Sequence, residues 1–159
     1  MADLTPLDEK LAEVLGLAQA AQDATTRVAG MEGADEFTST LERMKQEAAE
    51  TERRVDELVD GIDGKKTAIR EKAAETKSEA KEMMSTYLAE EEEALDGFEF
   101  LTMAEAGELG HWEIVKTMSD TLGDEQVSTL AGWAVGVQRK HVEQVRESSL
   151  ELAAGEVRG

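Results

Sequence analysis

The residues of this chain with the clearest capacity for chemistry are its two histidines, each of which follows a polar residue by three positions. Glu108 precedes His111, and Gln138 precedes His141. Residues three apart lie on one face of an α-helix, so each pair can project into the same space. In helical bundles, a carboxylate and a histidine at this spacing supply ligands to di-metal centres. The two pairs therefore indicate a candidate metal site.

The stretch 94–152 must position these pairs, and its pattern predicts two antiparallel helices. Gly123 is a typical helix stop and Asp124 a typical helix start. In a hairpin that turns at this point, Glu108 lies level with Gln138 and His141. We expect Glu108 and both histidines on the inner faces of the hairpin, with Glu108 between the two histidines.

The preceding residues predict a second hairpin and a connection between the two. Thr5 and Pro6 are typical of a helix start, and apolar residues recur at three- and four-residue steps through the range 6–62. The range 65–90 is helix-prone but rich in charge, and a run of four glutamates follows at its end. It predicts a short crossover helix that lies over one end of the bundle. The whole chain, 1–159, is then one all-α domain: a four-helix bundle of hairpins 6–62 and 94–152.

Composition supports an all-helical protein and limits its partners. The chain of 159 residues contains one proline and 4% aromatic residues, and 40% of it is hydrophobic. Its formal net charge of −19 repels nucleic acid and anionic lipid. We expect neither nucleic acid nor a membrane among the partners. No apolar run approaches the roughly 20 residues of a membrane span, and the first residues lack the apolar core typical of a signal peptide. We therefore expect a cytoplasmic location.

The same charge points to the salt conditions in which the protein works. A large carboxylate excess is typical of halophilic proteins, because concentrated salt screens the self-repulsion. We therefore expect the stability of this chain to rise with the concentration of potassium chloride. There is no cysteine, which excludes disulfides and thiolate chemistry.

One stretch carries a family resemblance. Leu109-Gly-His111-Trp112-Glu113-Ile114 and the later Asp120-Thr-Leu-Gly123-Asp124 resemble segments of the ferritin-like superfamily, within it the bacterial stress-associated YciE/YciF-type group. A weaker similarity covers Glu50-Thr51 with Arg54 and Leu58. The order of hairpin, crossover and hairpin is similar too. The resemblance implies a ferritin-like four-helix bundle and a role in the stress response.

The ligands that such a family uses are incomplete in this chain. Di-metal sites of this kind take a Glu from two helices and Glu-x-x-His from the other two. In the chain, Gln138 stands in place of an expected Glu, and Glu52 in place of an expected His. The first helix offers Ala18 and Ala21 on its inner face. The candidate ligands for iron or manganese are Glu108, His111, His141 and Glu52.

The same side chains are equally compatible with two purely structural roles. They can form a hydrogen-bonded polar layer that fixes helix register, or they can lie at the bundle margin and face water. Two functional classes follow. The first is a stress-associated structural or interaction protein without a complete di-metal site. The alternative is a di-iron or di-manganese protein with iron- or peroxide-linked chemistry; no residue is assigned as catalytic.

The aromatic residues predict how the chain assembles. The 94–122 helix carries more aromatic side chains than one core face requires; these are Phe98, Phe100 and Trp112. We expect them to contribute to a homodimer, because most soluble oligomers are symmetric and bury the same face of both copies.

Overall fold

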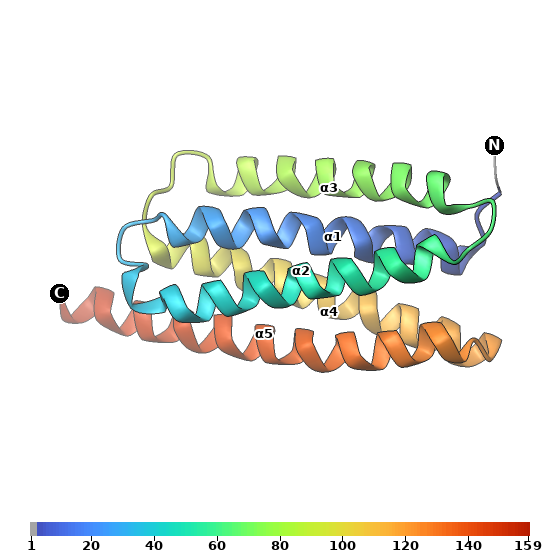
Figure 1. The fold of residues 1–159 in the computed structure, drawn as a ribbon. Coiled ribbons are helices and arrows are strands. Elements are labelled where there is room, and N and C mark those ends of the chain that lie inside the picture. Colours follow the sequence, from blue (N-terminus) through green and yellow to red (C-terminus); the bar gives the residue numbers. More distant parts are fainter. Residues whose placement is uncertain (1–2) are drawn as a thin grey trace.

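The computed structural model describes residues 3–159, and α-helices make up most of this range (Figure 1). In chain order the helices are α1 (Pro6–Ala29), α2 (Thr38–Asp60), α3 (Lys66–Leu88), α4 (Ala94–Leu122) and α5 (Glu125–Arg158), with one 3-10 turn, η1, at Asp35–Phe37. No β-strand occurs in the described range. The all-α class is thus confirmed, and α5 continues beyond its predicted end at Leu152.

The helix ends form as the local sequence predicts. Thr5 accepts a hydrogen bond from the backbone N–H of Asp8, whose side chain accepts one from the N–H of Thr5, so the two residues form a capping box. Gly123 ends α4 with φ of 71°, a left-handed conformation that favours glycine. Asp124 then begins α5 by accepting a hydrogen bond from the N–H of Val127. These caps fix the α4–α5 hairpin at the predicted turn.

Four of the helices enclose the core. α1 packs against α2 and α4, and α5 packs against the other sides of α2 and α4, so the contacts close a ring. Neighbouring helices in this ring run antiparallel, as the colours of Figure 1 show. Trp112, Val14, Val55 and Leu101 are among the fully buried side chains. Glu105, Glu108 and His141 are buried in this core as well.

The helix outside this ring, α3, does not lie where the sequence predicted. The expectation of a short helix over one end of the bundle is wrong, because α3 has 23 residues and runs the length of α1 on the outside of the ring (Figure 1). Its narrow apolar stripe is Ile69, Ala73, Met84 and Leu88. That stripe suffices because α1 offers small residues, which let the two backbones approach closely.

Gly16 of α1 is the point of closest approach. A Cβ atom added at Gly16 would meet the carbonyl oxygen of Ala73 and lie 2.8 Å from the Cβ of Thr76. We expect Gly16→Ala to destabilise the protein by about 1–3 kcal/mol, because backbone cannot move aside as a flexible side chain can. Urea denaturation followed by circular dichroism measures this change.

Gly136 provides the matched control. It lies on the exposed side of α5, and an added Cβ meets nothing within 4 Å. Gly136→Ala should raise stability by about 0.5–1 kcal/mol through helix propensity alone. Equal effects of the two substitutions would contradict the close approach of α1 and α3.

The three aromatic residues expected at a dimer interface lie in the core instead. Phe98 and Trp112 are 0% exposed and Phe100 is 5% exposed. α4 buries them because it packs on three other helices, α1, α3 and α5, and so has more than one inner face. The expected placement of these residues at an interface was therefore wrong. The homodimer stays a prediction, which the molar mass from light scattering would test.

No helix in the part of the chain that the structure describes combines the length and apolarity needed to cross a bilayer.

Candidate functional site

The buried face of α4 differs from the predicted one by about one position. The sequence analysis placed Glu108 and His111 on the inner face of this helix. In the structure Glu105, Glu108 and Trp112 are buried there, and His111 lies at the margin with its side chain 40% exposed. Glu108 is buried with either choice of inner face, so its position in the sequence does not distinguish the two.

A chain of polar side chains crosses the core from α2 through α5 to α4. The Nε2 atom of His141 lies 3.2 Å from Oε1 of Glu47, and its Nδ1 atom lies 3.6 Å from Oε1 of Glu105. Gln138 donates a hydrogen bond of 3.1 Å to the other oxygen of Glu105. His141 therefore stands between two carboxylates, one buried and one that reaches the surface.

This environment sets the charge of His141. Burial alone would lower the pKa of the imidazole, because it disfavours the cation. The interactions with Glu105 and Glu47 outweigh burial and raise that pKa above 6.5. His141 thus supplies the positive charge that allows a carboxylate such as Glu105 to remain in the core.

Glu108 lies beside Glu105 but is not paired with a cation. Complete burial, the charge of Glu105 and a hydrogen bond with Glu105 all raise the pKa of Glu108 well above its ordinary value of 4.5. Protonated Glu108 can donate its one proton to Glu105. Within residues 3–159, its Oε2 atom has no hydrogen-bond partner.

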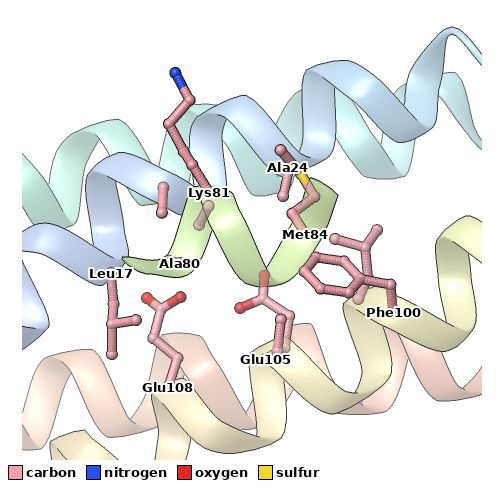
Figure 2. A pocket seen from close by; sticks show the side chains of 12 residues that line it. Leu17, Ala24, Ala80, Lys81, Met84, Phe100, Glu105 and Glu108 are labelled. Atoms are coloured by element: carbon pink, nitrogen blue, oxygen red, sulfur yellow. The ribbon is translucent and has the colours of Figure 1, made fainter. Parts of the chain in front are cut away.

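Glu105 and Glu108 both face a small cavity. It has a volume of about 50 Å³ and lies between α1, α3 and α4, and three alanines of α1 leave the space open. Figure 2 shows both carboxyl groups pointing from α4 toward α1 and α3. The lining is otherwise apolar and consists of Leu17, Ala20, Ala21, Ala24, Ala80, Met84, Phe100, Leu101, Ala104 and the stem of Lys81.

The four predicted metal ligands do not come together. The Nδ1 atom of His111 forms a hydrogen bond with the carbonyl oxygen of Gly107, and its Nε2 atom lies 3.5 Å from a carboxylate oxygen of Glu13 on α1. Glu52 accepts hydrogen bonds from two glutamines of α1, Gln19 and Gln22. Neither makes any of the contacts of the Glu47–His141–Glu105 chain. The expectation that the two histidines are neighbours with Glu108 between them was wrong.

The residues that are present do not fit a di-metal centre. Both nitrogen atoms of His141 already face carboxylates. α1 offers alanines to the cavity where a ferritin-like site requires a carboxylate. Across residues 3–159, no three His, Cys, Asp or Glu side chains are placed so as to hold a metal ion. The arrangement instead suits proton sharing and the fixing of helix register.

Two residues of this site were missed from the sequence. Glu105 falls on the buried stripe that continues from Phe98 and Leu101 at alternating steps of three and four, and this spacing was available. Glu47 lies one turn before Thr51 on α2 and had no comparable signal, because its contact with His141 depends on how α2 meets α5.

Comparison with protein-family models, with curated proteins and with solved structures gave no match to this chain.

Proposed function

We propose that this chain is a ferritin-like, stress-associated bundle that acts as a structural or interaction protein, without a complete di-metal site. The observation that carries the proposal is the Glu47–His141–Glu105 chain. It joins three helices through an imidazole whose two nitrogen atoms both face protein carboxylates, at 3.2 Å and 3.6 Å. Buried polar groups of this kind specify register, since a shifted helix would leave charges unpaired in the core.

The fold arrangement supports the ferritin-like part of the proposal. Two antiparallel hairpins, α1–α2 and α4–α5, form the ring. The connecting helix α3 runs back along the bundle, so α2 and α4 point in the same direction (Figure 1). Ferritin-like bundles contain one such long crossover connection. The helix α3 occupies that place here.

The experiment that tests the proposal is a thermal melt with and without ferrous or manganous ion. We expect no shift in the wild-type melting temperature. A metal at 100 times its dissociation constant would add about 2.7 kcal/mol, or several degrees for a protein of this size.

A double variant makes the measurement specific. His141→Leu with Glu105→Gln removes the nitrogen and carboxylate donors together, and leaves no unpaired cation. A metal-dependent rise of several degrees in wild type that disappears in the double variant would reject the proposal. It would favour the alternative, iron- or manganese-dependent chemistry inside the bundle.

A further inference from the structure

The polar chain accounts for Glu47, His141 and Glu105, but it leaves Glu108 without a role. Glu108 is 4% exposed, and its Oε2 atom lacks a hydrogen-bond partner in the described range. An unsatisfied polar atom costs stability when buried, so native proteins contain few of them. Glu108 also lines two adjoining spaces, the inner cavity and an outer groove. Its orphaned oxygen is therefore directed at space that a ligand can enter.

The outer groove runs between α1, α3 and α4 and has a volume of about 470 Å³. Two exposed carboxylates of α3, Glu75 and Glu79, lie on its lining, one helical turn apart. The same lining holds apolar side chains, among them Leu17, Ala80, Met83, Met103 and Ala104, and it also holds Lys10, Lys72 and His111. Lys10 and His111 both lie beside Glu13. The groove therefore presents the exposed Glu75 and Glu79, opposed by Lys72 alone, and the buried Glu108, with apolar side chains forming its wall.

We propose that this groove binds a linear aliphatic polyamine, with one ammonium group at Glu108 and a second at Glu75 and Glu79. An ammonium is a pure hydrogen-bond donor, and the unpartnered oxygen of Glu108 is an acceptor. The methylene segment between two ammonium groups matches the apolar wall. The net charge of −19 draws polycations toward the surface.

The charges at the floor of the groove favour a cation over other ligands. Glu105 faces His141, whereas Glu108 makes no ion pair within residues 3–159. Glu108 can release its proton to solvent when an ammonium supplies the positive charge that this second carboxyl lacks, whereas a carboxylate ligand would meet two acidic groups. The inner cavity of about 50 Å³ exceeds the roughly 10–15 Å³ that one water requires, so a slender chain end can enter.

Isothermal titration calorimetry with spermidine at constant ionic strength tests the proposal. We expect saturable binding at one site per chain in wild type. Glu108→Gln should weaken it roughly tenfold or more, because glutamate can release its proton and become a charged acceptor when the ammonium binds, whereas glutamine stays neutral. Glu143→Gln removes an exposed carboxylate of α5 outside the groove and should bind as wild type does.

Two comparisons separate this site from general attraction to an acidic protein. Ala80→Leu fills the junction between cavity and groove, and we expect it to weaken spermidine binding as much as Glu108→Gln does. Magnesium ion carries two charges without a chain and should not compete at equal concentration. Equal spermidine affinity of wild type and Glu108→Gln would overturn the proposal. So would the absence of saturable binding, unchanged affinity in Ala80→Leu, or competition by magnesium.

Discussion

Glu108→Gln is expected to make the protein more stable at neutral pH. The pKa of Glu108 is raised in the folded state above 4.5, so the folded chain holds a proton that the unfolded chain releases. Stability therefore falls as pH rises from 4.5 toward the folded pKa, by up to about 1.4 kcal/mol per pH unit. Glutamine has the shape of the protonated acid and does not titrate. The gain at pH 7 is the stability that wild type loses between pH 4.5 and pH 7 through this proton.

The pH dependence identifies the cause of this gain. The difference in unfolding free energy between Glu108→Gln and wild type should be near zero at pH 4.5 and grow with pH, as measured by urea denaturation. Glu143→Gln, an exposed carboxylate on α5, should show no such growth. A difference that is constant across this pH range would contradict a buried, protonated Glu108.

Removal of His141 should have the opposite effect. His141→Ala is expected to cost about 3–5 kcal/mol, because it leaves Glu105 buried without its cation and opens a void. The raised pKa of His141 means that its ionic contribution is full below pH 6.5 and is lost as pH rises through the folded pKa. The cost of His141→Ala should therefore be largest at acid pH and smaller at alkaline pH.

A double-mutant cycle separates charge from packing. His141→Leu keeps the volume but still leaves Glu105 unpaired, so it should also destabilise. Adding Glu105→Gln should recover part of the loss, because the unpaired carboxylate is then absent. Additive effects of the two substitutions in chemical denaturation would contradict the contact between them.

The features predicted correctly from the sequence are those that depend on a few neighbouring residues. The capping box at Thr5 and the turn at Gly123 are local hydrogen-bond and backbone preferences, and the structure forms both. The predicted helix ranges followed from these local start and stop signals and from the spacing of apolar residues. The all-α class required nothing further.

The features missed depend on how helices meet. The place of α3 follows from the lack of a side chain at Gly16, which no periodicity within α3 can reveal. A carboxylate such as Glu105 is expected to face solvent, and it is buried here because His141 offsets its desolvation from another helix. The contact of Glu47 with His141 joins residues far apart in sequence, so only tertiary packing shows it.

The outer position of α3 has a consequence for how the protein fluctuates. α3 buries only Ile69, Ala73, Met84 and Leu88, and it packs almost entirely on α1, with minor contacts to α4 and α2. Segments with few buried apolar contacts open at lower free energy than the rest of a native structure. Amide protons of α3 should therefore exchange with deuterium as one cooperative unit, before those of α1 and α4. Each such opening exposes Glu108 to solvent while the four-helix ring stays folded.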